Sequence, residues 1–259
     1  MKSVDPSPVA RRLRPYVVSA DAELLRQAEA MGYIVQHAFS ASGEAWFEAL
    51  RALDRLVFQS SAMVLPGWVF FDCALAPGFV VGLADDLRAP SSGDEAPSPS
   101  GPRPVSLAIA IPTADPEIQL VHSLGVAPHG TSEALKTTWD LLVELVAWSP
   151  KSGGVLATAG WGTQAEELYA RHAPIALLAA YMPAHDQPMT ATLGLGPRFS
   201  SVPPEAVARV LACDADGLRA LQSELDAGAS AWVLGALAPG SDGTPVRRIA
   251  VLAGPMEAR

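Results

Sequence analysis

The stretch VHSLGVAPHGTSEALKTTWDLLVEL, residues 121–145, decides the fold because it joins a strand to a helix through a short turn. Apolar residues recur at three- and four-residue steps in its second half, which places Leu135, Trp139, Leu142 and Val146 on one helix face. The first half is a short, mostly apolar run that ends in a turn containing glycine and proline. The stretch therefore predicts a strand–turn–helix unit.

The turn inside this unit has two interpretations, and the sequence leaves both open. A helix begins with backbone N–H groups that have no partner within it, and they attract an anion such as a pyrophosphate. Gly130 lets the backbone come close to a ligand, while Thr131 and Ser132 add N–H groups and hydroxyls. In the other interpretation, Thr131 or Ser132 only caps the helix, and Glu133 favours the helix dipole.

The composition is that of a compact globular chain with room for one large domain and a small appendage. Of its 259 residues, 49% are apolar and 17% are charged. A net charge of −9 argues against a nucleic-acid partner, since neutralising phosphates takes clustered Lys and Arg. No apolar run reaches the ~20 residues of a membrane-spanning helix, and none follows the N-terminal arginines as a secretion signal would. We therefore expect a cytoplasmic protein without a membrane partner.

The cysteines and histidines predict no metal site. Cys73 and Cys213 are far apart, lie beside apolar stretches and lack metal-ligand spacing, so we expect buried thiols. His37, His172 and His185 are also not spaced as metal ligands.

Periodicity and turn signals predict the remaining elements. Helices are expected over residues 21–32, 41–61, 163–173, 203–212 and 214–228. Strands are expected as a pair within 67–87 around a turn at 76–78, as a pair within 104–126 around 113–116, and over 153–160, 174–182, 189–196, 230–238 and 246–254. This order predicts an α/β (α+β) protein whose last part is an α-α-β-β extension.

The chain is expected to divide into a main domain with two appendages. Residues 1–15 are a flexible tail, 16–199 form the main domain, and 200–259 are the extension, which packs on it. Within the main domain, APSSGDEAPSPSGPRP (89–104) is predicted to be a disordered hairpin loop because Pro, Ser and Gly cannot bury enough apolar surface to order it.

The order helix, hairpin, long strand, helix, strand, helix, strand, strand resembles the GNAT (GCN5-related N-acetyltransferase) fold. In that family a strand ending L-x-V-x-P leads into a glycine-containing loop and a helix, and SLGVAPHGTSEAL keeps Leu124, Val126, Pro128 and Gly130 at similar places. A later family element, N-x-x-A-x-x-x-Y, is similar to GTQAEELYARHAP, which keeps the alanine and the tyrosine, with Gly162 in place of the asparagine.

The resemblance implies a mostly antiparallel central sheet flanked by helices and a site for acetyl-CoA or another acyl-CoA. The backbone around Leu124 and Val126 would pair with the pantetheine arm. His129, Gly130, Thr131 and Ser132 would hold the pyrophosphate. Tyr169, at the family's tyrosine position, would be the acid that protonates the leaving thiolate.

Two residues are candidates for the base that accepts the amine proton. Glu117 lies near the start of the long strand and His122 lies within it. Strand parity places Glu117 on the face opposite Leu120, His122 and Leu124, so only one of the two bases points into a cleft unless a bulge intervenes. A solvated strand-end carboxylate and a buried core histidine are the structural alternatives.

Three functions follow from these patterns. The first is an acyl-CoA-dependent N-acyltransferase acting on a small-molecule or protein amine. The second is a catalytically inactive GNAT-like binding or assembly module, and the third is an unrelated α+β protein. A GNAT sheet splays between its fourth and fifth strands, so an unbroken sheet at Val126 and Leu156 would exclude the first two. The acceptor amine, the acyl length and the oligomeric state (a homodimer or a complex with another protein) stay open.

Overall fold

The structure is a computed structural model, and it describes residues 13–58, 69–70, 72, 74–75, 78–85, 103–128, 130–148, 153–182, 190–199, 201–241 and 243–253. The predictions for His129, for Cys73 and for most of the tail and of the 89–104 loop lie outside these residues. Where the described residues overlap the tail and the loop, Leu13 to Pro15 belong to a strand, and so do Arg103 and Pro104.

The described elements follow one another along the chain in a mixed α/β order. They are β1 Leu13–Ser19, α1 Ala22–Ala30, β2 Ile34–His37, α2 Ala41–Phe58, β3 Phe79–Asp85, β4 Arg103–Pro104, β5 Ser106–Pro112, β6 Ile118–Val126, α4 Ser132–Trp148, β7 Gly154–Gly160, α5 Gln164–Ala170, β8 Ile175–Ala179, β9 Thr190–Leu195, β10 Val207–Ala212, α6 Ala215–Asp226, β11 Ser230–Val233, β12 Ala238–Pro239 and β13 Pro245–Leu252.

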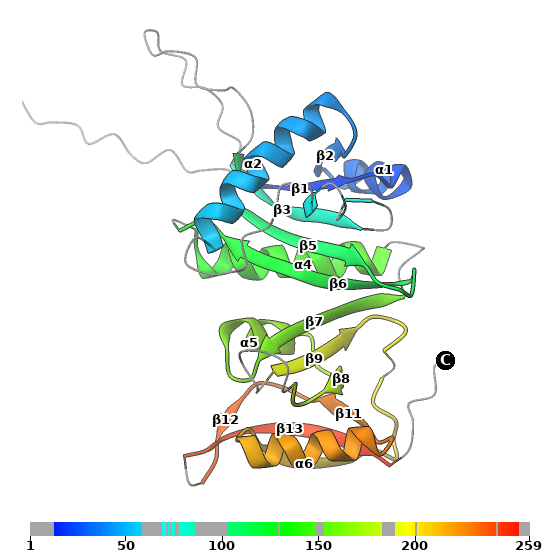
Figure 1. Ribbon diagram of the computed structural model, residues 1–259, viewed down its shortest axis with the longest axis vertical. Helices are drawn as coiled ribbons and strands as arrows, with labels where there is room; N and C mark the ends of the chain where they lie inside the picture. The colour runs from blue at the N-terminus through cyan, green and yellow to red at the C-terminus, as the bar shows by residue number, and fades with distance from the viewer. Residues whose placement is uncertain are drawn as a thin grey trace, which may run out of the picture.

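The strands join into one 13-stranded sheet with the order β10-β13-β11-β8-β9-β7-β6-β5-β3-β1-β2, and β4 and β12 attach to β3 and β13 (Figure 1). The pairs β1–β2 and β6–β7 are parallel, and the other pairs are antiparallel. β9 lies between β7 and β8, although it follows both in the sequence. The predicted mostly antiparallel sheet flanked by helices is confirmed.

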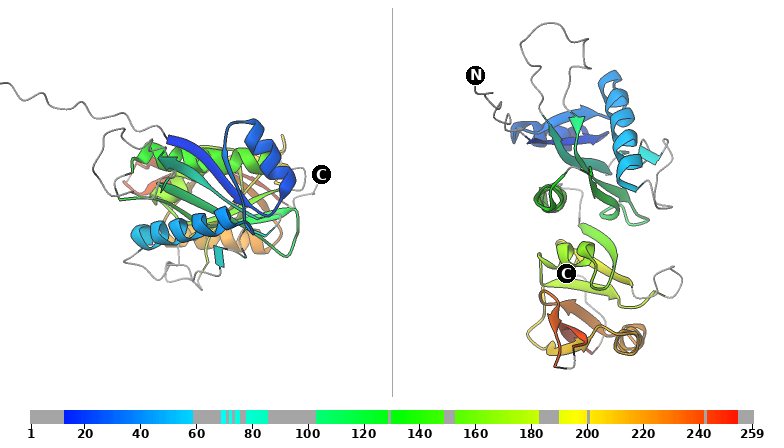
Figure 2. Two further views of the ribbon diagram at one scale, coloured as in Figure 1. Left: turned by 90° about the horizontal axis from the view of Figure 1, so that it is seen from above. Right: turned by 90° about the vertical axis from the view of Figure 1, so that its left-hand side faces the viewer.

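The helices cover both faces of the sheet, so there is a core on each side (Figure 2). Helices α1, α4, α5 and α6 contribute to the larger core, and α2 packs on the opposite face. In β3, Val81 points into the first core and Val80 into the second. All seven residues of β3 are buried, which explains why this strand is a continuous apolar run in the sequence.

Gly82 allows a hydrogen bond to cross the middle of the sheet. β3 lies between β1 and β5, and Gly82 is the β3 partner of Tyr16. The buried Tyr16 hydroxyl passes over this glycine and donates to the Ser106 carbonyl on β5 at 2.7 Å. A Cβ at residue 82 would run into that carbonyl. Three strands are thus joined by one side chain that needs a glycine beneath it.

The C-terminal unit differs from its prediction in one element. Residues 203–212 were expected to be a helix, but Val207–Ala212 form β10, so the extension, apart from the two-residue β12, is β-α-β-β rather than α-α-β-β. The apolar spacing of VARVLA suits either structure. Six residue pairs with β13 decide for the strand, which is a case of tertiary pairing overriding local pattern.

The prediction that the first of two strands within residues 67–87 precedes the turn at 76–78 is also wrong. Val69, Phe70 and Asp72 are helical, and the Ala74 N–H donates to the Phe70 carbonyl at 3.2 Å. Phe70 is fully buried in the α2-side core, so a short apolar run fills a core position without joining the sheet. The predicted helices at α1, α2, α4, α5 and α6 and the strands at β3, β5–β9, β11 and β13 are confirmed.

We expect Gly82→Ala to lower the free energy of unfolding by about 1–3 kcal/mol, because the Ser106 backbone and Tyr16 must both shift. Urea unfolding followed by circular dichroism measures the change. Gly235→Ala is the matched control, since an added methyl there meets no atom within 4 Å. The control should be unchanged or slightly more stable. If both variants change the free energy of unfolding by the same amount, the hydrogen bond from Tyr16 to Ser106 is not the reason for a glycine at residue 82.

Candidate functional site

β6 and β7 pair at one end and then separate. Ile118–Leu120 lie opposite Gly154–Leu156 in three parallel pairs. Beyond them β6 stays paired with β5, and β7 stays paired with β9 as far as Gly160. Figure 1 shows the two strands diverging from this short contact. Val126 therefore has no partner in β7, and the unbroken sheet that would exclude a GNAT-like protein is not found.

A β-bulge in β6 coincides with the separation. Ile109 pairs with Ser123 and Ala110 with Val121, which leaves His122 as the extra residue. Val121 belongs to the core on the α4 side, and Leu124 packs against the same core. Two residues three apart share a face only because of the bulge. The predicted parity, with Leu120, His122 and Leu124 on one face, is therefore wrong.

The backbone of Leu124 and Val126 faces the open edge. The Ala127 N–H donates to the Val105 carbonyl, on the β5 side, at 2.8 Å. A trans peptide points its C=O opposite to its N–H, so the Val126 carbonyl points away from β5. Backbone groups alternate along a strand, which turns those of Leu124 the same way. In the part of the chain that the structure describes, no strand pairs with this side of Leu124 and Val126, so their backbone groups are open to an extended ligand with amide groups.

The turn after β6 bears on both interpretations of the helix start. The Gly130 N–H donates to the Ala127 carbonyl at 2.7 Å, and the Thr131 hydroxyl accepts from the Ala134 N–H at 3.1 Å. Thr131 is thus the cap of α4. Within the described residues, the N–H groups of Thr131, Ser132 and Glu133 have no hydrogen-bond partner, and these residues are exposed. Capping and anion binding are therefore compatible, since different N–H groups serve them.

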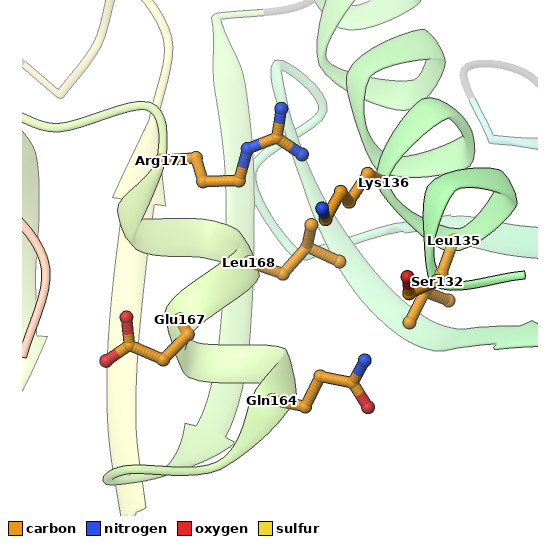
Figure 3. A pocket seen from close by; sticks show the side chains of 7 residues that line it. All are labelled: Ser132, Leu135, Lys136, Gln164, Glu167, Leu168 and Arg171. Atoms are coloured by element: carbon orange, nitrogen blue, oxygen red, sulfur yellow. The ribbon is translucent and has the colours of Figure 1, made fainter.

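A groove of about 270 Å³ lies between the N-terminal half of α4 and the length of α5 (Figure 3). Its lining residues are Ser132, Leu135, Lys136, Gln164, Glu167, Leu168 and Arg171. On each helix these positions are three or four residues apart and share one face. The groove begins at the exposed N–H groups of the α4 start.

Comparisons with known proteins give matches to solved structures alone. No family model and no curated protein sequence matches the chain. The chain is similar to the ribosomal-protein-S18-alanine N-acetyltransferase from Escherichia coli, at 12% identity over 64% of this chain and 94% of that one, with a TM-score of 0.40. It is also similar to NAA60 from Arabidopsis thaliana in complex with a bisubstrate analogue, at 15% identity over 58% and 92%, with a TM-score of 0.40.

A further similarity is to the NatC complex bound to Gag peptide and CoA, at 10% identity over 61% of this chain and 94% of that chain, with a TM-score of 0.41. The decisive observations are in the structure itself. They are the strand order, in which β9 inserts between β7 and β8, and the separation of β6 from β7. The chain has a GNAT-like fold.

Sequence reasoning missed four polar residues of the groove in this GNAT-like domain, and one of them, Glu167, is acidic. Lys136 and Arg171 bring positive charge, and Gln164 brings an amide. Lys136 lies 3.6 Å from Glu133, and Arg171 lies 3.7 Å from Asp140, both as partly exposed pairs. Such pairs contribute little stability, so the cations can turn to a ligand at small cost. The available signal was position: Lys136 is one helical turn after Ser132, on the same face.

Tyr169 is buried behind the groove. It is 4% exposed, and its ring contacts Trp139 at a tilt of 40°, with centroids 4.4 Å apart. Its neighbour Leu168 lines the groove in its place. Burial raises the pKa of Tyr169 to about 12. The hydroxyl therefore stays protonated at neutral pH, as an acid requires.

Glu117 lies at the closed end of the β6–β7 contact. Its carboxylate accepts from Arg198 at 2.8 Å, and Arg198 also bonds Asp115 at 2.9 Å. Its backbone carbonyl accepts from the Gly153 N–H at 2.6 Å. Val126 is nine residues further along the chain, about 30 Å away at ~3.3 Å per strand residue. The structure does not bring Glu117 to the open end.

His122 is half-buried at the bulge, and its Nδ1 lies 3.1 Å from the Ser123 hydroxyl. It follows Leu120, the last β6 residue that pairs with β7, by two positions. Of the two candidate bases, His122 is thus the one near the point of separation.

The described residues contain no candidate metal cluster and no candidate membrane-spanning helix. No three or more His, Cys, Asp or Glu side chains there form a group that could hold a metal ion. No helix in that part of the chain is both long and apolar enough to cross a membrane.

We expect Thr131→Ala to lower the free energy of unfolding by about 1 kcal/mol, because Ala134 loses its cap. Ser132→Ala, one residue later and without a capping bond, should change it by less than about 0.5 kcal/mol. Urea unfolding of both variants makes the comparison. A larger loss for Ser132→Ala would mean that Ser132 is the cap.

The pKa of Tyr169 predicts a loss of stability in alkali. An unfolded tyrosine ionises near its ordinary pKa of 10, whereas the folded Tyr169 ionises near about 12. Stability is therefore full below pH 10 and falls as the pH rises, since only the unfolded state releases this proton. At ~1.4 kcal/mol per pKa unit, wild type should lose about 1 kcal/mol more than Tyr169→Phe between pH 9 and pH 11. If the urea midpoints of wild type and Tyr169→Phe change with pH in the same way over this range, the raised pKa of Tyr169 is contradicted.

Proposed function

We propose that the protein is an acyl-CoA-dependent N-acyltransferase that acts on a small-molecule or protein amine. One observation carries the proposal: the open edge of β6 leads directly to exposed helix N–H groups and to the α4–α5 groove. A bound acyl-CoA supplies an acyl group activated as a thioester.

The residues present fit this cofactor. Its pyrophosphate suits the N–H groups of Ser132 and Glu133 at the positive end of the α4 dipole. Gly130 keeps the turn compact, since a side chain there would run into Val126. Acetyl-CoA or a longer acyl-CoA would present the same phosphates. His129, predicted to help hold them, is outside the described residues.

The pantetheine arm and the outer phosphate groups also find partners. The amides of the arm suit the unpaired backbone of Leu124 and Val126 and the side-chain amide of Gln164, which stands two residues after Gly162. Lys136 and Arg171 offer charge-assisted hydrogen bonds to phosphate oxygens. Most of these contacts come from backbone groups.

For the chemistry, we propose His122 as the base and Tyr169 as the acid. His122 is at the bulge where the strands separate, whereas Glu117 is tied to Arg198 at the closed end. Tyr169 keeps its proton at neutral pH.

A GNAT-like module that binds without turnover is the second candidate. It is favoured by the burial of Tyr169 against Trp139, which leaves the hydroxyl little access to a reacting group. Acetyl-CoA binding together with no transfer to any amine would decide for it. Transfer that Tyr169→Phe or His122→Gln abolishes would decide against it.

Isothermal titration with acetyl-CoA and with longer acyl-CoAs tests the cofactor proposal. We expect binding by wild type and a loss of about tenfold or more in Lys136→Gln/Arg171→Gln, because charge-assisted bonds are worth about 1.5–3 kcal/mol each. Arg51→Gln is the control, an arginine on α2 that pairs with Glu48 by 2.8 Å at the surface. It should bind as wild type does. Absence of heat with every acyl-CoA would remove the proposed function.

A further inference from the structure

We propose that Arg247, contributed by the C-terminal unit, is a positioning residue of the groove: it holds the Glu167 carboxylate aside so that a polyanion can enter. The inference rests on the proposed function, because an acyl-CoA is the polyanion concerned.

Arg247 connects two parts of the chain that are 80 residues apart. It lies on β13, is fully buried, and donates through Nη2 to Glu167 at 2.7 Å and to Glu166 of α5. Its Nη1 donates to the Gly235 carbonyl at 2.6 Å. The guanidinium is thus fixed between the last strand and the helix that forms one wall of the groove.

Glu167 belongs both to the groove and to this ion-pair network. It lines the groove, and its side chain is 37% exposed. Its Oε1 accepts from Arg247 and, at 3.3 Å, from the Leu237 N–H of the C-terminal unit. Figure 3 shows the carboxylate turned away from α4, while Leu168 points across toward it. The C-terminal unit therefore supplies both donors that draw the carboxylate back.

Electrostatics gives this arrangement a consequence for binding. A carboxylate that faces a phosphate group in the groove repels it, and this repulsion is stronger near a protein surface than in bulk water. A guanidinium that pairs with Glu167 offsets this repulsion and increases its distance from the ligand. Without Arg247, the Glu167 carboxylate would have no guanidinium partner in a groove that is proposed to bind an anion.

Glu166 is the second carboxylate partner of Arg247, and it does not line the groove. It is fully buried, and burial raises its pKa by more than the nearby guanidinium lowers it. Among the described residues, its Oε1 has no hydrogen-bond partner. Glu167 is the partner that is partly exposed and lines the groove, so it is the carboxylate that a ligand in the groove would meet.

An anchoring role alone is the competing explanation, in which Arg247 only fastens the C-terminal unit to α5. The two explanations differ in one respect. If Arg247 acts by removing the charge of Glu167 from the groove, neutralising Glu167 must compensate for the loss of Arg247. If it only anchors, the second substitution removes another contact and brings no recovery.

The test is a double-mutant cycle read by titration with acetyl-CoA. We expect Arg247→Gln to weaken binding about tenfold or more, Glu167→Gln to change it by less than about threefold, and the double variant to return within about threefold of wild type. The deficit of Arg247→Gln should shrink at 0.5 M NaCl, since salt screens the repulsion. Arg248→Gln, an exposed residue on the same strand, is the matched control and should bind as wild type does.

A double variant as weak as Arg247→Gln, or an Arg247→Gln variant that binds normally, would overturn the inference. If Arg247→Gln does not fold, the cycle is built on Glu166→Leu/Arg247→Met, which removes the buried charges together and keeps Glu167. Glu167→Gln must then restore binding in that background. If wild type binds no acyl-CoA, the proposed function fails first. If wild type binds acyl-CoA but the effects of the substitutions at residues 167 and 247 on affinity are independent, only this inference is contradicted.

Discussion

The parallel contact between β6 and β7 is three residues long, and the candidate site depends on its shortness. At the closed end, Arg198 binds Asp115 and Glu117, and Gly153 donates to the Glu117 carbonyl. Beyond it each strand is held by a different neighbour, β5 for β6 and β9 for β7, so neither needs the other. The bulge then bends β6 where the contact ends. The result is a strand edge with unpaired backbone groups that stays inside the sheet.

The separated halves of the sheet need another connection, and the helices and the C-terminal unit supply it. Trp139 of α4 contacts Tyr169 of α5, so the two walls of the groove share one core. Arg247 ties α5 to β13 through a buried ion pair. A buried ion pair adds little net stability, but removing one partner leaves a costly unpaired charge. The network therefore links α5 to β13 without adding much net stability.

The sequence predicted the elements whose local pattern agrees with their packing, such as α4 and the fully buried β3. It was wrong for residues 203–212, since only the edge of β13 makes a strand of them. The bulge at His122 leaves no trace in the pattern and reverses the parity on which the choice of face depended. The contact of Arg247 with α5 could not be predicted from the sequence for a different reason. Its partners are 80 residues away, and no spacing rule spans a tertiary contact of that length.

A GNAT-like fold can persist in a chain whose sequence keeps little of the family's motif. Side-chain identity matters little if the ligand contacts are backbone N–H and C=O groups, which any residue supplies. Gly162 then replaces the family's asparagine with Gln164 nearby, and Ser132 stands in a turn whose tight packing needs only Gly130. What must be kept is the geometry: strands that separate, a helix that starts at their mouth, and a second helix held at the right distance. In this chain the second helix, α5, is bonded through Glu166 and Glu167 to Arg247 of β13.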